Sequence, residues 1–343
     1  MYIDDGGSMK KFLVVFSIVF CILFMTGCGK KAPENNTENN EKKEVPVKKV
    51  KVVDLESNTR PIAVMINNLN DARPYQSGLQ DAYIVYEIIV EGGVTRMLAV
   101  FKDANTARLG PVRSSRHYYL DYALENDAIY VHYGWSPQAK SDIRTLGINN
   151  INGLYDDSPF TREDLPVAWE HRVFTSIERL IANAKKKNYR MTSDAKTLLN
   201  YSVDEVTIDN EEAIDANEID IKYSYYTTTG YKYNPEDKLY YRSVNGKEHV
   251  DYVSKKQFTA KNIIIAYAAN SYIANDNKGR QDLNNLGTGS GYYITDGKAV
   301  PITWEKKTRK DQTVYRYKDG KEITVNDGNT FIQIAPPKSA TIK

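Results

Sequence analysis

Side chains that could bind or transform a charged ligand are concentrated in residues 81–135, where arginine, glutamate and histidine are interspersed with tyrosine and small residues. An arginine fork donates two parallel hydrogen bonds to a carboxylate or phosphate and keeps its charge at physiological pH. Glutamate and histidine are common general acids and bases. The candidate ligand-binding arginines are Arg96, Arg113 and Arg116, and the candidate catalytic groups are Glu87, Glu91 and His132. The stretch therefore predicts a site for an anionic ligand.

The two glutamates are predicted to lie on a β-strand. Residues 82–90 are rich in Tyr, Ile and Val, and a pair of glycines ends the run after too few residues for a typical helix. Side chains alternate between the faces of a strand, so Glu87 and Glu91 are expected on the same face. Residues 96–101 predict an antiparallel partner strand, which would bring Arg96 near Glu91.

Arg113 and Arg116 are predicted to flank the start of a helix. Aromatic and apolar residues recur at helical spacing after residue 118, and Ser114 or Ser115 would be the N-cap. A helix start presents unpaired N–H groups and a partial positive charge. Both serines and both arginines are therefore expected to contribute to the anion site.

His132 is predicted to lie at the carboxyl end of a further strand, residues 128–133. A helix follows, with Ser136 as N-cap, Pro137 at its first position and Gly147 at its end. Ligands gather at this end of the strands in open α/β sheets, so His132 is a candidate ligand-binding residue as well as a candidate catalytic one.

A long polar loop, residues 151–176, supplies two more candidate ligand-binding residues, Arg162 and His171. Irregular loops of this length are often functional. The same polar groups could instead serve only to hydrogen-bond the loop in place, and the sequence does not decide between these interpretations.

Three interpretations of the whole cluster follow. In the first, the arginines hold an anionic group of a ligand, a wall polymer or a partner protein. In the second, the chain is a cell-envelope hydrolase or transferase that uses Glu87 or Glu91 with His132. In the third, glutamates and arginines form a purely structural ion network. Cα atoms four residues apart on a strand are separated by about 13 Å, which disfavours the enzyme.

The composition excludes several classes of function. Lys and Arg number 46 and Asp and Glu 44, a net charge of +2, whereas a nucleic-acid binder is expected to be strongly basic. The sequence has no P-loop, GxSxG, HExxH or dinucleotide-binding motif, and its four histidines lack metal-ligand spacing. We therefore expect no nucleic-acid partner, no metal and no cofactor.

The N-terminus predicts a lipoprotein signal peptide, residues 1–28, with Met9 as the true start. Two lysines precede the apolar run 12–25, which is shorter than the about 20 residues of a membrane span. The following Met-Thr-Gly-Cys fits a lipobox, in which Cys28 receives acyl lipid such as palmitate and becomes the first mature residue. Cys28 would then attach the protein to the outer face of the cytoplasmic membrane. The other cysteine, Cys21, lies in the segment that is removed, so the mature domains would contain no thiol.

The rest of the chain predicts a tether and two domains of an α+β fold. Residues 29–56 are rich in Asn, Lys and Glu and predict a flexible tether. Residues 57–210 predict a mixed α/β domain. Residues 211–343 predict a mostly β domain, because short Tyr-, Ile- and Thr-rich runs alternate with Asn-Gly and Asp-Gly hairpin turns.

Two helices are predicted before the boundary between these domains. Thr175 and Glu178 form a capping box at the start of an amphipathic helix, whose last turn contains lysines. Residues 193–201 predict a second, shorter helix.

A series of motifs, in order along the chain, resembles the YerB-like lipoproteins of Gram-positive bacteria. These motifs are RPIAVMINN (60–68), ARPYQSGL (72–79), VYEIIVEGGVTRMLAVF (85–101), LGPVRSSR (109–116), AIYVHYGWSPQA (128–139), ITWEK (302–306) and GNTFIQIAPP (328–337). The resemblance extends from about Arg60 to the end. It implies a pair of domains of unknown function and an extracytoplasmic location, and it implies no reaction.

Overall fold

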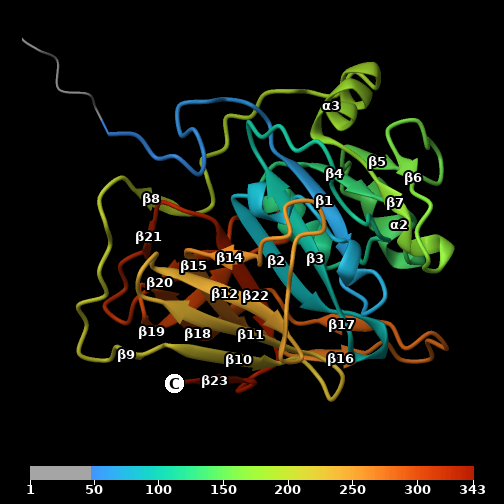
Figure 1. The fold of residues 1–343 in the computed structure, drawn as a ribbon. Helices are drawn as coiled ribbons and strands as arrows, with labels where there is room; N and C mark the ends of the chain where they lie inside the picture. The colour runs from blue at the N-terminus through green and yellow to red at the C-terminus, as the bar shows by residue number, and fades with distance from the viewer. Residues whose placement is uncertain (1–47) are drawn as a thin grey trace, which may run out of the picture. The chain divides into compact units, whose positions relative to one another are not determined.

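The structure is a computed structural model that describes residues 48–343 (Figure 1). The predicted signal peptide, the lipidation site Cys28 and most of the predicted tether lie outside these residues. Within residues 48–343, no helix is both long and apolar enough to span a membrane.

An 11-stranded sheet forms the centre of the described chain. In order across the sheet, its strands are β20 (Val314–Arg316), β19 (Lys298–Lys306), β18 (Gly287–Thr295), β15 (Asn262–Tyr267), β22 (Thr330–Ala335), β2 (Ile84–Ile89), β3 (Thr95–Phe101), β1 (Ile62–Asn67), β4 (Ile129–His132) and β5 (Asn150–Asn152), with β9 (Ile214–Asp215) paired to β19. The predicted strands around Glu87, Arg96 and His132 are thereby confirmed. Each run is rich in β-branched and aromatic residues, which suit a strand that is buried on both faces.

In the part of this sheet from β15 to β5, six strands run in the same direction. β2, β22 and β15 are mutually parallel, as are β1, β4 and β5, and the antiparallel strand β3 joins the two groups. Their carboxyl ends therefore lie along one edge, which we call the carboxyl edge. This is the edge where ligands bind in open α/β sheets.

The central sheet is continuous across the predicted domain boundary at residue 211. Strand β2 pairs in parallel with β22, in register from Ile84 opposite Thr330 to Ile88 opposite Ile334. The α+β fold class is confirmed, because all the described helices lie before residue 187 and the later residues form strands and loops. The two halves contribute to one sheet.

A second sheet packs on one face of the central sheet. Its strands are β13 (Lys247–Glu248), β12 (Leu239–Val244), β11 (Thr228–Asn234), β10 (Glu218–Lys222) and β23 (Ala340–Ile342), with β14 (Thr259–Ala260) paired to β12. The predicted hairpin turns at Asn245-Gly246 and Asp296-Gly297 are confirmed, and both residues of each pair have positive φ. Three two-stranded pairs complete the β structure: β16 (Asn270–Tyr272) with β17 (Gln281–Leu283), β8 (Asn200–Ser202) with β21 (Thr324–Asn326), and β6 (Thr161–Arg162) with β7 (Val173–Phe174).

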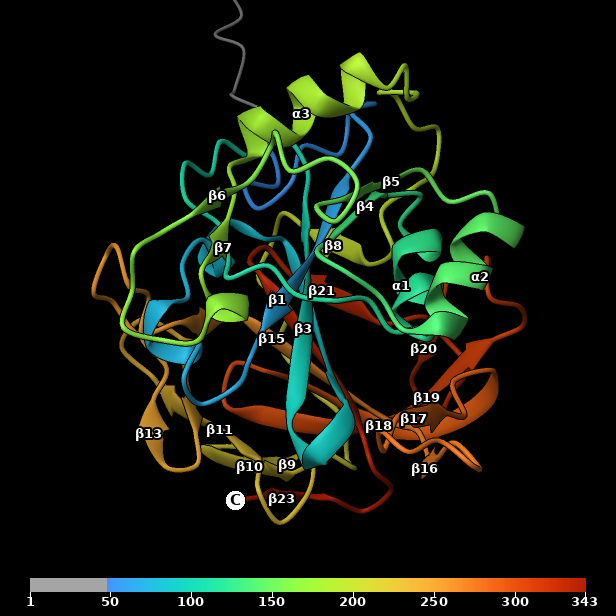
Figure 2. The same ribbon diagram turned by 90° about the vertical axis from the view of Figure 1, so that its right-hand side faces the viewer.

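Alternating residues of the central strands belong to two hydrophobic cores, one on each face. Tyr86 and Tyr130 pack with helix α1 (Tyr119–Glu125), whereas Val85 and Val131 belong to the core that includes helix α3 (Ile177–Lys186) and the second sheet. Figure 2 shows α1 and helix α2 (Pro137–Thr145) together on one side of β1 and β3, with α3 above them. Short 3-10 helices lie at Arg73–Tyr75, Leu79–Asp81, Glu91–Gly93 and Trp169–His171.

The predicted helix after residue 132 is confirmed. Ser136 accepts a hydrogen bond from Ala139 N (3.2 Å), Pro137 is the first residue of α2, and Gly147 follows with φ +67°. The amphipathic helix α3 is also confirmed, but the predicted N-cap, Thr175, lies one residue before the observed one. Ser176 accepts from Arg179 N, while the Thr175 hydroxyl donates to Pro159 O.

The predicted helix at residues 193–201 is wrong. Residues 193–199 form no helix, and residues 200–202 are strand β8, which pairs with β21. Leu199 and Tyr201, two residues apart, are buried in the same core, which is the spacing of extended chain. Ser193 Oγ accepts from Ala195 N, a local bond that competes with helix formation.

The last residues of the predicted tether pack against the fold. Lys51 N and Val52 N donate to the Asp327 carboxylate at 2.9–3.0 Å, and Val53 is buried.

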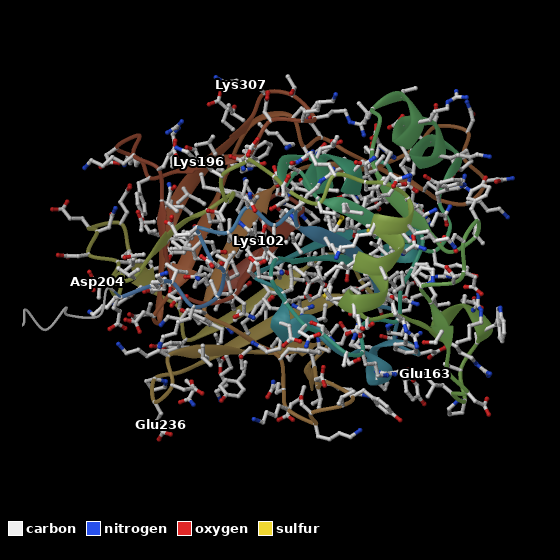
Figure 3. All side chains as sticks on the ribbon, turned by 90° about the horizontal axis from the view of Figure 1, so that it is seen from above. Lys102, Glu163, Lys196, Asp204, Glu236 and Lys307 are labelled. Carbon is white, nitrogen blue, oxygen red and sulfur yellow. The ribbon has the colours of Figure 1, made fainter. Side chains whose placement is uncertain are left out.

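Charged side chains of both signs are distributed around the molecule rather than gathered on one side, as Lys307, Asp204 and Glu236 illustrate in Figure 3.

Candidate functional site

The segment 111–116 crosses the carboxyl edge between β1 and β4. Asn67 N donates to Pro111 O and Arg113 N donates to Met65 O, both at 2.9 Å, and Ser115 N donates to Gly134 O at 2.9 Å. The segment is therefore extended, because its backbone groups are paired with neighbouring chain rather than with a helix. It places Arg113 at the carboxyl end of β1, beside the loop that follows β4.

The predicted helix start at Ser114 or Ser115 is wrong. Helix α1 begins at Tyr119, and no side chain caps it. Ser114 Oγ instead donates to Tyr133 O (2.9 Å), and Ser115 Oγ accepts from the Tyr130 hydroxyl (2.8 Å). Segment 111–116 therefore offers arginine side chains to an anion, but it does not offer the free N–H groups of a helix start.

Arg96 and Arg116 share a single carboxylate. Glu91 accepts hydrogen bonds from Nε and Nη2 of Arg116, the latter at 2.6 Å, and its Oε2 lies 3.6 Å from Arg96 Nη2. Arg96 also donates to Ser114 O (2.6 Å). Burial raises the pKa of Glu91, but the hydrogen bonds and charge of Arg116 outweigh this and lower it overall. Glu91 is therefore ionised at neutral pH and is unsuited to act as a general acid.

Arg113 is the arginine that this network leaves free. Among residues 48–343, its side chain has neither a hydrogen bond nor an ion pair, although it is only partly exposed and its Nε is buried. Burial lowers its pKa, and the nearby Glu170 raises it. A half-buried guanidinium without a partner is unusual because desolvation of its donors is left uncompensated.

Other unpaired donors lie at the same edge. Six buried side-chain polar atoms lack partners in the described chain, and three of them are donors from Arg96 (Nε), Arg113 (Nε) and Asn152 (Nδ2). Asn152 ends β5, and its Oδ1 accepts from Gly134 N and Leu154 N, both at 3.0 Å. Unpaired donors of this kind suit a ligand that carries acceptor atoms.

His132 lies at the carboxyl end of β4, as predicted, and its surroundings disfavour the catalytic role that was considered for it. Its side chain is fully buried, Nδ1 donates to Gly134 O (2.7 Å), and Nε2 contacts the amide group of Asn150 (3.1 Å). Burial lowers its pKa to about 4. With both nitrogens occupied, it can neither transfer a proton nor bind a ligand directly.

Glu87 and Glu91 do not lie on the same face, contrary to the prediction. β2 ends at Ile89, and Glu91 belongs to the 3-10 turn beyond it, so the alternation of the strand no longer applies. Glu87 faces the second sheet, whereas Glu91 contacts Arg96 on the opposite face. The two glutamates therefore cannot act together on one bond.

Glu87 is fully buried in an ion pair with Arg242, which is buried to the same extent. Arg242 Nη2 donates to Glu87 at 2.8 Å, and Asn68, Thr95 and Thr229 also donate to its carboxylate. All of these partners are internal, which favours the structural interpretation for Glu87 and disfavours a hydrolase that uses it.

A second buried ion pair joins the two halves of the chain. Lys306, from the ITWEK motif, donates to Glu125 of α1 at 2.8 Å, and both side chains are almost fully buried. Thr313 and Tyr86 donate to the same carboxylate. Pairing with a residue so distant in sequence was not predictable from local patterns.

The two loop candidates have different neighbours. His171 Nδ1 accepts from Asn67 Nδ2 (2.8 Å) at the end of β1, and burial followed by the charge of Arg113 lowers the pKa of His171. Arg162 lies over the rings of Tyr133 (4.9 Å) and Trp169 (4.2 Å). The structure thus brings His171 close to Arg113 and places Arg162 among aromatic rings.

Sequence reasoning missed Asn152 and Trp135 as site residues. Asn152 is the last residue of β5 and Trp135 comes shortly after the end of β4, and this position at the carboxyl edge was the signal that could have identified them. Within the described residues, no group of three or more His, Cys, Asp or Glu side chains could hold a metal.

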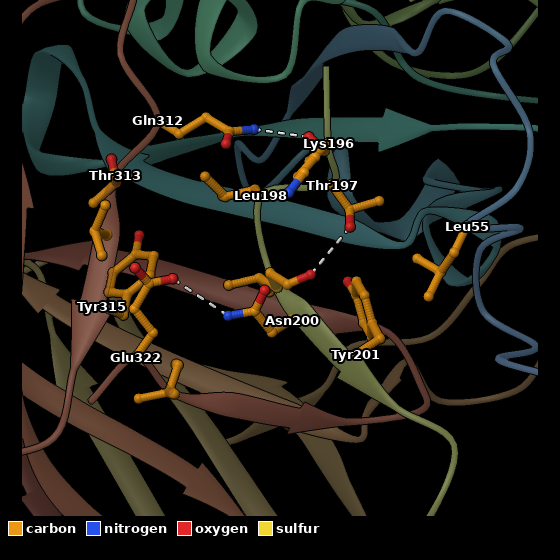
Figure 4. Close-up of a pocket in the computed structure, with 13 residues that line it drawn as sticks. Leu55, Lys196, Thr197, Leu198, Asn200, Tyr201, Gln312, Thr313, Tyr315 and Glu322 are labelled. Atoms are coloured by element: carbon orange, nitrogen blue, oxygen red, sulfur yellow. Dashed lines mark hydrogen bonds between the residues drawn. The ribbon is translucent and has the colours of Figure 1, made fainter. Parts of the chain in front are cut away.

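A separate cavity of about 460 Å³ lies between residues 196–201 and 312–323 (Figure 4). Hydrogen bonds from Gln312 to Lys196 O (2.8 Å) and from Asn200 to Glu322 (3.4 Å) cross it. Its lining includes no residue of the carboxyl-edge site.

Comparison with known proteins identifies relatives along nearly the whole chain. Residues 50–190 match the family described as "Protein of unknown function (DUF3048) N-terminal domain", and residues 219–332 match the corresponding C-terminal domain. The chain is 31% identical over 336 residues to "Putative lipoprotein YerB" of Bacillus subtilis (strain 168), covering 97% of each chain. The crystal structure of YerB from Bacillus subtilis superimposes with a TM-score of 0.74, covering 86% of this chain and 99% of that one. On its motifs, its matched domains and its fold, the chain belongs to the YerB-like family.

Proposed function

We propose that this protein is a lipid-anchored binding protein on the outer face of the cytoplasmic membrane, and that Arg113 holds an anionic group of its ligand. The observation that supports this function is the half-buried Arg113 guanidinium, which has no partner among residues 48–343. The anionic group would belong to a wall polymer or to a partner protein.

The local balance of charge favours an anion. Arg96, Arg113 and Arg116 supply three positive charges, and Glu91 contributes one negative charge in direct contact. Glu170 is exposed and acts on Arg113 only at longer range. An incoming carboxylate or phosphate would therefore meet an excess of positive charge, together with a planar fork for two hydrogen bonds.

The structural interpretation accounts for part of the cluster and leaves Arg113 unexplained. Arg96 and Arg116 are held by Glu91 and by backbone carbonyl groups, as expected of an internal network. If the cluster served stability alone, Arg113 would be expected to have a carboxylate of its own.

The membrane anchor rests on the sequence and on the relative. Cys28 fits a lipobox, and the similar Bacillus subtilis protein bears the name of a lipoprotein. Residues 29–50 would separate the folded part from the membrane and let the carboxyl edge reach ligands in the envelope.

Co-sedimentation with purified cell-wall sacculi tests this function. The probe protein is residues 48–343, which contain the whole central sheet, and a comparable length of the relative is folded in its crystal. We expect this fragment to pellet with sacculi at low salt, to be released as salt rises, and to liberate no soluble wall fragments. Arg113→Ala should abolish pelleting.

The matched control is Arg179→Ala, because Arg179 is an exposed arginine on α3. Thermal unfolding of each variant separates lost binding from lost folding. Undiminished pelleting of a folded Arg113→Ala variant would refute the function, as would liberation of wall fragments that Glu91→Gln abolishes.

A further inference from the structure

Four aromatic rings form a stack that leads from the core to the surface beside Arg113. The ring centroids of Tyr130 and His132 are 5.0 Å apart, those of His132 and Trp135 are 5.5 Å apart, and those of Trp135 and Tyr155 are 5.3 Å apart. Tyr130 and His132 are fully buried, whereas Tyr155 is 69% exposed. The outer rings are thus held in place from below, which lowers the entropy lost when a ligand packs on them.

Two further large apolar side chains are exposed, and Leu154 is the one that lies near Gly134. Leu154 is 61% exposed and Trp169 is 62% exposed, and the guanidinium of Arg162 lies against Trp169. Isolated exposed apolar residues are common, but Leu154 and Tyr155 are exposed together just after β5, and adjacent exposed groups of this kind indicate a binding surface.

Trp135 also borders a surface pocket of about 570 Å³. Lys140 and Arg144 of α2 line the pocket, and Lys140 Nζ lies 5.7 Å from the centroid of the Trp135 ring. An aromatic wall with a few polar groups at its margin is the usual composition of a small-molecule site.

Gly134 connects the aromatic stack to Arg113. It has φ +84°, and a Cβ there would lie 3.0 Å from Ser114 Oγ and 3.5 Å from Leu154 Cδ1. On one side, Ser115 N donates to Gly134 O; on the other, Gly134 N donates to Asn152, whose Nδ2 is buried without a partner. The absence of a side chain at Gly134 therefore lets the loop that carries Trp135 pack directly against the segment that carries Arg113.

We propose that the ligand is an acidic saccharide, whose sugar rings pack on Trp135 and Tyr155 while its carboxylate or phosphate binds Arg113. This inference rests on the proposed function and specifies its ligand class. The C–H groups on the face of a pyranose ring pack against the negative face of an aromatic ring.

The structure favours a saccharide over an acidic peptide. An extended peptide would add to the sheet beyond β5, its edge strand. β5 has only three residues, and the Tyr189 hydroxyl already donates to Asn150 O (2.8 Å). Little free strand edge remains for a peptide to pair with.

Tryptophan fluorescence provides the test, because the chain has three tryptophans and Trp304 is buried in β19. Residues 48–343 are titrated with a neutral β-1,4-linked N-acetylglucosamine tetramer, with a tetramer of the same backbone that carries carboxylates, and with an octamer of glutamate. We expect the carboxylated tetramer to change the fluorescence and to bind at least about tenfold more tightly than the neutral one.

The variants separate this inference from the proposed function. Tyr155→Ala removes an exposed ring without disturbing the core, and it should lower the affinity for the carboxylated tetramer about tenfold. Arg113→Ala should reduce the affinity for the carboxylated tetramer to that for the neutral one. Trp304→Phe should leave both affinities unchanged.

Two outcomes would overturn the proposal that the ligand is a saccharide and leave the proposal of anion binding intact. One is equal affinity of wild type and Tyr155→Ala for the carboxylated tetramer, with Arg113 still required. The other is binding of the glutamate octamer alone, again dependent on Arg113. If Arg113→Ala changes no affinity, the proposed function itself fails.

Discussion

The ion pair between Glu87 and Arg242 should be a principal link between the two halves of the chain. Both side chains are fully buried, and the pair joins β2 of the central sheet to β12 of the second sheet. Arg242→Met would leave a buried carboxylate without a cation and would remove the donors to His249 Nδ1 and to the Tyr231 hydroxyl. Loss of one partner from a buried pair costs about 3–5 kcal/mol.

The expected value lies near the middle of that range. Asn68, Thr95 and Thr229 donate to Glu87 before and after the substitution, so the carboxylate keeps part of its hydrogen bonding and the upper end of that range is not expected. We therefore expect Arg242→Met to lower the free energy of unfolding by about 4 kcal/mol. The measurement is chemical denaturation of residues 48–343. Wild type and variant are compared with the same slope of unfolding free energy against denaturant concentration.

A double-mutant cycle with Glu87→Gln isolates the interaction, and its coupling energy should exceed about 1.5 kcal/mol. The control is Lys232→Met, because Lys232 lies 4.0 Å from Glu218 in an exposed pair worth less than about 1 kcal/mol. Similar denaturation midpoints for Arg242→Met and Lys232→Met would refute the reasoning, as would a coupling energy near zero.

Two further predictions concern the carboxyl edge. His132 has a pKa of about 4 in the fold against 6.5 in the unfolded chain, so the unfolded state binds more protons between these values and stability falls as pH drops from about 6.5 to about 4. The loss attributable to His132 is about 3 kcal/mol, and a pH-independent stability difference between wild type and His132→Gln would contradict it. Gly134→Ala should cost about 1–2 kcal/mol in denaturation from its positive φ, and more from contact with Ser114 Oγ. Gly147→Ala shares the positive φ but meets open space, so an equal cost for both variants would show that the contact is unimportant.

Local sequence patterns were sufficient to predict the strands that build the site. The runs around Glu87, Arg96 and His132 are short and rich in β-branched and aromatic residues, and each became a buried strand. The position of His132 at the carboxyl end of β4 was also correct. The burial of its side chain was not predicted, because alternation along a strand does not reveal that both faces of a sheet are covered.

The errors arise where a local pattern ends or a distant partner intervenes. Glu91 lies two residues beyond β2, so the face predicted from strand alternation was wrong. The predicted helix start at Ser114 failed because residues 111–116 pair with β1 and with the loop after β4. Neither the parallel pairing of β2 with β22 nor the pairing of Glu87 with Arg242 leaves a local sequence signal.

The internal ion network and the free arginine fit together as parts of one site. Glu91 neutralises one of two neighbouring arginines and fixes the side chains of both, so Arg96 and Arg116 cannot fold over Arg113 and the surplus positive charge remains at the edge. Without Glu91, three guanidinium groups would have no carboxylate in direct contact and would repel one another, and the extended segment 111–116 that positions Arg113 would be less stable. Finding such a network beside Arg113 is therefore consistent with ligand binding and is no argument against it.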